Sequence, residues 1–318
     1  MPPRPAGVLC AGNLVLDILV RPVDKIPWGG TAWVESIDQF LGGNGANTSY
    51  TLGRLGVPVR LAGAAGNDVF GDFVLEWLAG AGVDLRMVER TEEPTATTVG
   101  LVQADGTRAF LHRLGASKRT TTAKVDWREQ AGEGYGHFHL GNAFALPLMR
   151  GSAAGALKAA KDAGLTTSMD TGWDAGGEWM AVLGPCLPQT DILFVNQDEA
   201  RAMSGSADPA EAAGYFRSHG SGVVVVKMGG DGCAVFDAGD EFLAPAFQTE
   251  VVDSTGAGDC FAGGFLAALH YGADVREAAL FANAVGALSI GALGAVTGIR
   301  NREETLEWMR RARIHSAS

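Results

Sequence analysis

The chain has 318 residues, of which 47% are hydrophobic and 19% are charged, as is typical of a globular protein with a large core. Its 25 lysines and arginines against 36 aspartates and glutamates give a formal net charge of −11, which argues against a nucleic-acid or anionic-membrane partner. No apolar run reaches the roughly 18 residues that suggest a membrane span. The four cysteines are widely spaced without a zinc or redox motif, so we expect reduced thiols and a cytoplasmic location.

Short runs typical of buried strands alternate with helical patterns along the chain. The predicted strands are 7–11, 59–64, 136–140, 165–170, 191–195 and 222–227, and the helices between them are 46–55, 69–79, 147–163 and 209–218. This alternation predicts an α/β fold with a doubly wound, mainly parallel sheet flanked by helices. Ligands bind such sheets at the carboxyl ends of the strands, where Asn142, Asp170 and Asn196 fall.

Two regions depart from this rhythm and are typical of extended hairpins. They are 14–20 with 31–40, and 95–102 with 108–113, the second pair turning at Ala104-Asp105-Gly106. They predict either a small separate sheet, which would serve as a lid or a dimer surface, or an extra antiparallel edge on the main sheet. Further antiparallel strands are expected at 233–236 and 241–245, followed later by helices at 274–290 and 302–313. No linker divides the chain, so we expect one domain over 1–318.

The segment 41–47 opens a predicted helix with glycines and two asparagines. Asparagine both donates and accepts hydrogen bonds, which suits a neutral polyol better than a phosphate. Asn13 and Asp17, after the first strand, add another amide and a carboxylate. Ordinary turn and cap chemistry also explains each residue taken alone.

The most informative segment is Asp253-Ser254-Thr255-Gly256-Ala257-Gly258-Asp259, which opens an apolar helix. Its two glycines favour a close-approach backbone at a helix start, where unpaired N–H groups bind phosphate. Asp259 would lie in the first turn beside that anion. A carboxylate there could accept a proton from an attacking hydroxyl during phosphoryl transfer, or it could merely favour the helix dipole. Neither a P-loop motif nor a strict G-x-G-x-x-G occurs, so P-loop and dinucleotide-binding interpretations lose their main support.

Together these elements resemble the ribokinase-like, phosphofructokinase-B-type carbohydrate kinase family. The resemblance runs from Gly12 to about Gly294 and is carried by Gly42-Gly43 with Asn47, Asn196 to Glu199, Lys227 with Gly229 and Gly232, and Asp253 to Asp259. It implies a doubly wound α/β core with a small β-sheet lid formed by strands from about 14–40 and 95–113. A homodimer through this lid is one arrangement that we consider.

Residue by residue, the resemblance makes Asp259 the catalytic base, with the amides of Gly256, Ala257 and Gly258 as an anion hole. It implies ATP and Mg²⁺ as cofactors, Glu199 acting on Mg²⁺ through water. The sugar-holding positions would be Asn13, Asp17, Gly42, Gly43 and Asn47, and the nucleotide positions Asn196, Glu199, Lys227, Gly229, Gly232 and Asn283. Asp253 and the carbonyl of Thr255 match a monovalent-cation site of some members, which makes K⁺ a further candidate.

The sequence therefore predicts ATP-dependent phosphorylation of a hydroxymethyl group on a sugar or sugar-like substrate. Two alternatives stay open. Adenosine-type nucleoside kinases share these motifs, and a non-catalytic sugar-binding protein could use the same scaffold. The intact Asp259 argues against the second alternative, because a binding module has no use for a base.

Overall fold

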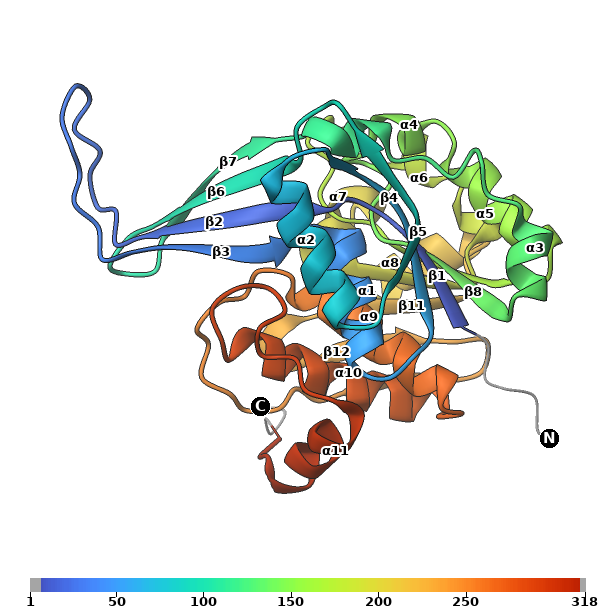
Figure 1. Cartoon of the computed structure of the whole chain (residues 1–318). Helices are drawn as coiled ribbons and strands as arrows, with labels where there is room; N and C mark the ends of the chain where they lie inside the picture. The colour runs from blue at the N-terminus through green and yellow to red at the C-terminus, as the bar shows by residue number, and fades with distance from the viewer. Residues whose placement is uncertain (1–6, 315–318) are drawn as a thin grey trace.

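The structure, a computed structural model, describes residues 7–314 and contains two β-sheets (Figure 1). The larger sheet has nine strands in the order β13-β12-β11-β10-β9-β8-β1-β4-β5, and only β12 and β13 break its parallel pairing. Its strands are β1 (Gly7–Ala11), β4 (Val59–Gly66), β5 (Asp84–Thr91), β8 (Tyr135–Leu140), β9 (Thr166–Asp170), β10 (Ile192–Asn196), β11 (Val223–Lys227), β12 (Cys233–Phe236) and β13 (Glu241–Ala244).

Helices cover both faces of this sheet, as the alternation of the sequence predicts. They are α1 (Asn44–Arg54), α2 (Val69–Gly80), α3 (Trp127–Gly132), α4 (Pro147–Arg150), α5 (Ala153–Asp162), α6 (Met180–Leu183), α7 (Gln197–Ser204), α8 (Pro209–Ser218), α9 (Ala257–His270), α10 (Val275–Ile290) and α11 (Arg302–Arg311). Successive strand residues point into two different cores. In β10, Phe194 belongs to the core that includes side chains of α1, α9 and α10, and Val195 belongs to the core that includes side chains of α5 and α8. In the part of the chain that the structure describes, no helix could cross a membrane.

The smaller sheet is the lid, and it projects from the core with the long β2–β3 connection at its outer end (Figure 1). Its order is β3-β2-β6-β7, formed by β2 (Val15–Arg21), β3 (Ser36–Gly42), β6 (Ala96–Val102) and β7 (Arg108–Arg113). The prediction of a separate sheet is therefore confirmed over the extra-edge alternative. β2 and β6 pair in parallel, so the two predicted hairpins join side by side.

Glycines bring three helices of one face close together. A Cβ atom added at Gly263 of α9 would lie 2.9 Å from Thr51 of α1, and one added at Gly264 would lie 2.9 Å from Val285 of α10. No ordinary side chain fits at either position. The helix that carries Asp259 is therefore packed directly against both neighbouring helices.

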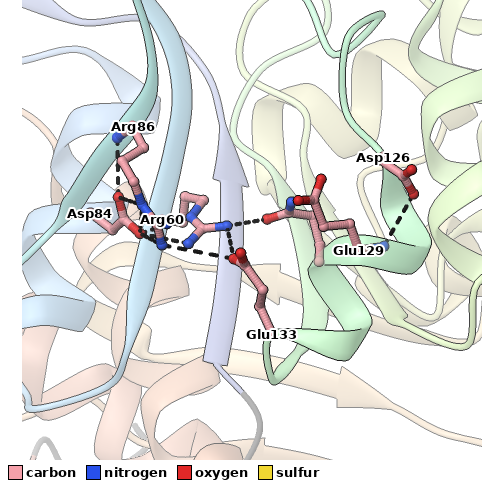
Figure 2. A network of polar contacts seen from close by, with 7 residues as sticks. Arg60, Asp84, Arg86, Asp126, Glu129 and Glu133 are labelled. Atoms are coloured by element: carbon pink, nitrogen blue, oxygen red, sulfur yellow. Dashed lines mark hydrogen bonds and ion pairs between the residues drawn. The ribbon is translucent and has the colours of Figure 1, made fainter.

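A buried ionic network joins the amino-terminal ends of β4 and β5 to α3 (Figure 2). Arg60 is 3% exposed and contacts Asp84 at 2.7 Å, Glu133 at 2.5 Å and the side-chain oxygen of Gln130. Because this network lies at the amino ends of the strands, far from their carboxyl ends, it serves stability.

Some predicted boundaries were wrong. The predicted strand 31–40 begins only at Ser36, because the residues before it belong to the loop after β2. The predicted helix 147–163 is two helices, separated where Gly151 ends α4. Strand β5 was missed altogether.

Candidate active site

Asp259 lies in the first turn of α9, where its buried carboxylate is bound by two asparagines. Nδ2 of Asn44 donates to Oδ1 at 2.7 Å, and Nδ2 of Asn47 donates to Oδ2 at 2.8 Å. Burial and the negative charge of Asp170 raise the pKa of Asp259 to about 6, against the lowering effect of these amides and of Lys227. A carboxyl with this pKa is ionised near neutral pH and is basic enough to accept a proton.

The backbone before Asp259 forms the helix start that the sequence predicts. Gly256 has a φ of 70°, a left-handed conformation that favours glycine, and a Cβ there would lie 2.6 Å from Cβ of Ala295. A Cβ on Gly258 would lie 3.0 Å from Nζ of Lys227. The segment 256–259 separates two cavities, since Gly256 and Asp259 line the first while Ala257 and Gly258 line the second.

The first cavity has a volume of about 270 Å³ and lies between the lid and the core. Its lining includes predicted sugar-holding residues, lid residues and residues of the segment 253–259: Asn13, Asp17, Gly43, Asn47, Thr98, Phe110, His112, Asp253, Thr255, Gly256 and Asp259. Gly42 lies behind Asp17, because a Cβ on it would come within 2.1 Å of the Asp17 carboxylate. Gly43 begins α1 with a φ of 94°.

Asp17 and Asn47 offer acceptors to a ligand in this cavity. Burial, with the charges of Asp253 and Asp259, raises the pKa of Asp17 to about 7, although a hydrogen bond with Thr98 opposes the shift. Oδ1 of Asn47 is buried without a hydrogen-bond partner. Oδ1 of Asn13 instead accepts the N–H of Asn44. An alcohol donor would satisfy the Asn47 oxygen, so the cavity suits a hydroxylated ligand.

The second cavity has a volume of about 420 Å³ and lies on the other side of the segment 256–259. All the predicted nucleotide residues except Glu199 line it, together with apolar side chains: Asn196, Lys227, Gly229, Gly232, Phe247, Val251, Phe261, Asn283 and Ile290. Nδ2 of Asn283 donates to the carbonyl of Ala244 at 2.9 Å and so fixes the wall. The apolar walls suit a flat aromatic base, and the glycine-lined end leaves room for phosphates.

Asn196 and Glu199 form a capping box at the start of α7. Oδ1 of Asn196 accepts the N–H of Glu199 at 2.8 Å, and Oε2 of Glu199 accepts the N–H of Asn196 at 3.0 Å and the hydroxyl of Thr171 at 2.9 Å. Burial raises the pKa of Glu199. Among the described residues, no three metal-ligating side chains converge on one point. Asn196 lines the second cavity, whereas Glu199 lies behind it in the capping box.

Lys227 ends β11 beside the helix start of α9, where its ammonium group pairs with Asp170 at 2.5 Å. Burial would lower the pKa of Lys227, but the charges of Asp170 and Glu199 outweigh it and the pKa is raised. Lys227 is therefore a permanent cation between the segment 256–259 and the second cavity.

Asp253 is buried beneath the lid, with donors on both oxygens. Oδ1 accepts the N–H of Thr255 at 2.9 Å and Nη1 of Arg108 at 2.7 Å, and Oδ2 accepts the N–H of Gly294 at 2.9 Å. Burial acts to raise the pKa of Asp253, but these hydrogen bonds and the Arg108 charge lower it overall.

Sequence reasoning missed three residues that contact this machinery. Asn44 lies in the recognised segment 41–47, but its contact with Asp259 was not predicted. Asp170 was placed only at the sheet edge, without its pairing to Lys227. Arg108 gave no signal at all, because its partner lies 145 positions away.

Comparison with known proteins agrees with this geometry. The model of the pfkB family carbohydrate kinases matches residues 7–302. The chain is 34% identical over 290 residues to the ATP-dependent ribose-1-phosphate kinase of Halopiger xanaduensis, covering 91% of this chain and 93% of that protein.

Solved structures show the same likeness. Arabidopsis thaliana ribokinase complexed with ribose and ATP superposes with a TM-score of 0.81 at 26% identity, covering 96% of this chain and 99% of that one. A protein from E. coli described as a ribokinase II, in complex with ATP and Mg²⁺, gives a TM-score of 0.85 at 26% identity and the same coverage.

Proposed function

Because the chain belongs to the pfkB family of carbohydrate kinases and is thus an ATP-dependent kinase, we propose that it phosphorylates a hydroxymethyl group of a sugar or sugar-like substrate. The observation that carries this proposal is the position of Asp259, at the boundary of a polar cavity and a glycine-lined one. The sugar would occupy the first cavity and ATP the second. The whole chain would act as one catalytic domain.

In this mechanism the carboxylate of Asp259 accepts the proton of the acceptor hydroxyl. The freed oxygen bonds to the γ-phosphorus as the bond from that phosphorus to the ADP oxygen breaks. The N–H groups of Gly256, Ala257 and Gly258 stabilise the charge on the transferred group, as helix-start donors do for anions. The adjacent ammonium group of Lys227 adds positive charge at the same point.

The sugar side is supported by the unpaired acceptor of Asn47 and the carboxylate of Asp17. Both accept hydrogen bonds from vicinal hydroxyls. Asn13 orients Asn44, and Gly42 and Gly43 let the backbone approach. Three aspartates, at 17, 253 and 259, line this cavity, and the cations Arg108 and Lys227 beside them are each already paired with an aspartate. We therefore expect a neutral acceptor to bind better than a sugar phosphate.

On the nucleotide side, Asn283 and the apolar walls would surround the adenine, with Lys227, Gly229 and Gly232 near the phosphates. Asn196 and Glu199 would bind Mg²⁺ through water, and the ion would neutralise phosphate charge. K⁺ stays a prediction from the family resemblance.

An ADP-release assay over pentoses, hexoses, ribose 1-phosphate and nucleosides tests the proposal, with D259N as the matched inactive control. We expect ADP release that needs both a neutral sugar and Asp259. Release only with adenosine or another nucleoside would favour the nucleoside-kinase alternative. Sugar binding without release by any acceptor would favour a non-catalytic binding protein.

A homodimer through the lid is also proposed, because large apolar side chains gather on it. Trp28 and Trp33, in the β2–β3 connection, are 94% and 92% exposed, and Ile37 and Leu111 are exposed on the edge strands. Light scattering should give twice the chain mass, and W28S/W33S should shift the mass toward the monomer. A monomeric wild-type protein at high concentration contradicts the dimer.

A further inference from the structure

We propose that Arg108 is a positioning residue that ties the lid to the catalytic segment 253–259, and that its guanidinium serves there as the resident cation in place of K⁺. The catalytic part of this inference rests on the proposed kinase function. The structural part, the tie itself, can be tested without any turnover.

The first support is the contact that Arg108 makes across the cavity. Nη1 lies 2.7 Å from Oδ1 of Asp253 and 3.3 Å from Oγ1 of Thr255. The Asp253 side chain is 1% exposed and that of Arg108 is 23% exposed, so water screens this pair weakly. Among the ion pairs of the described residues, it is the one that joins the lid sheet to the catalytic segment.

The second support is the strand that carries Arg108. Phe110 and His112 are two and four positions further along β7, so all three side chains point to the same face. Phe110 and His112 line the first cavity. The face of the lid that lines the first cavity is therefore the same face that binds Asp253 through Arg108.

The third support is the position of Asp253 relative to the anion hole. Its Oδ1 also accepts the N–H of Thr255, the residue before Gly256, and its Oδ2 accepts the N–H of Gly294. Ala295, next along the chain, packs against Gly256. Arg108 therefore binds a side chain that hydrogen-bonds to both backbone segments next to the predicted phosphate-binding amides.

The hydrogen-bond donors around Asp253 lie at the predicted monovalent-cation site of Asp253 and the Thr255 carbonyl. One carboxylate oxygen is already shared by a backbone N–H and a guanidinium, and the other is bonded to a backbone N–H. A second cation at Oδ1 would lie beside the positive guanidinium and be repelled. The chain's own arginine thus supplies the charge.

The kinetic test compares R108A and R108K with R113A, a control on the same strand whose guanidinium hydrogen-bonds to the carbonyl of Thr95 and the hydroxyl of Thr97. For R108A we expect kcat to fall on the order of 10²-fold, with little change in the KM for ATP, since a displaced segment misaligns the transition state. R108K should retain part of the rate, and R113A most of it. Added guanidinium or K⁺ should partly restore R108A, whereas wild-type turnover should be equal in K⁺ and in tetramethylammonium.

Hydrogen exchange of the wild type, R108A and R113A tests, without turnover, whether Arg108 connects the lid to the segment 253–259. R108A should speed exchange both in 95–113 and in 253–258, whereas R113A should speed it only in 95–113. A wild-type rate that depends severalfold on K⁺ overturns the proposal, as does an R108A protein with wild-type exchange in 253–258. If no acceptor gives turnover, the proposed kinase function fails, and the exchange data still decide whether Arg108 ties the lid to this segment.

Discussion

Nδ2 of Asn47 donates a hydrogen bond of 2.8 Å to Oδ2 of Asp259, across 212 positions of sequence. The bond joins α1, whose first turn lines the first cavity, to α9, whose first residues line the second cavity. The residue expected to take the proton is therefore oriented by the residue expected to bind the acceptor. In the proposed mechanism, sugar binding and proton transfer would share this pair of side chains.

Replacement of the base separates chemistry from binding. D259N keeps the size of the side chain, so we expect a folded protein that still binds ATP. Phosphoryl transfer should fall by a factor on the order of 10² or more, as for loss of a positioned base. Steady-state kinetics and calorimetric ATP titration measure both effects, and near-wild-type turnover would refute the assignment of Asp259.

The pH profile should show an acidic limb. Asp259, with its pKa raised to about 6, must be ionised to accept a proton, so kcat/KM should fall as pH drops through that value. Asp17 has a pKa of about 7 and repels Asp259, so the limb belongs to the pair. D17N removes the negative charge that Asp17 gains only near pH 7, so it should shorten the upper end of the limb and move the limb slightly to lower pH. An unchanged limb in D17N would show that the two carboxylates are not coupled.

Lys227 should matter for stability as well as for phosphate binding. K227M leaves Asp170 and Glu199 without their cation, and breaking a buried pair in this way costs about 3–5 kcal/mol. K161M is the matched control, because its partner Asp191 is partly exposed and such pairs contribute about 0–1 kcal/mol. Urea unfolding measures both variants. Equal midpoints for the two would contradict this reading of Lys227, and ATP affinity should fall only in K227M.

The ionic network of Arg60 at the amino-terminal ends of β4 and β5 should affect the stability of the protein but not its activity. R60M removes a buried guanidinium from Asp84 and Glu133, and we expect a loss on the order of 3 kcal/mol. R86M, whose side chain is 68% exposed and also contacts Asp84, should lose about 1 kcal/mol or less. Assayed below its unfolding temperature, R60M should keep the wild-type kcat. A large loss of kcat there would mean that this network reaches the active site.

The sequence predicted the central strands well because buried parallel strands are almost continuously apolar, as in β11 with its run of valines. Strand β5 lies at the edge of the sheet and carries Asp84, Arg86, Glu89 and Arg90, so its pattern resembled a loop. Helix α7 was not among the predicted helices, because its first turn holds the Asn196 to Glu199 motif, which the family resemblance assigned to the nucleotide site.

The candidate site was predictable where its residues lie in compact motifs, as at 42–47 and 253–259. The pairs Arg108–Asp253 and Lys227–Asp170 were not, because each joins segments that meet only in the folded chain. Composition and spacing carry no information about which strands of a lid lie over which loop. The charge balance around Asp253 therefore depends on tertiary structure.

The glycines at 263 and 264 let α9 contact α1 and α10 directly, and this makes the three helices a more rigid part of the molecule than the lid. These closely packed helices carry Asp259 and contribute residues to both cavities, and their close packing restricts their movement relative to one another. The lid, attached through its strands and Arg108, supplies other residues that line the first cavity. We therefore expect lid substitutions away from Arg108 to change acceptor preference while Asp259 keeps its alignment.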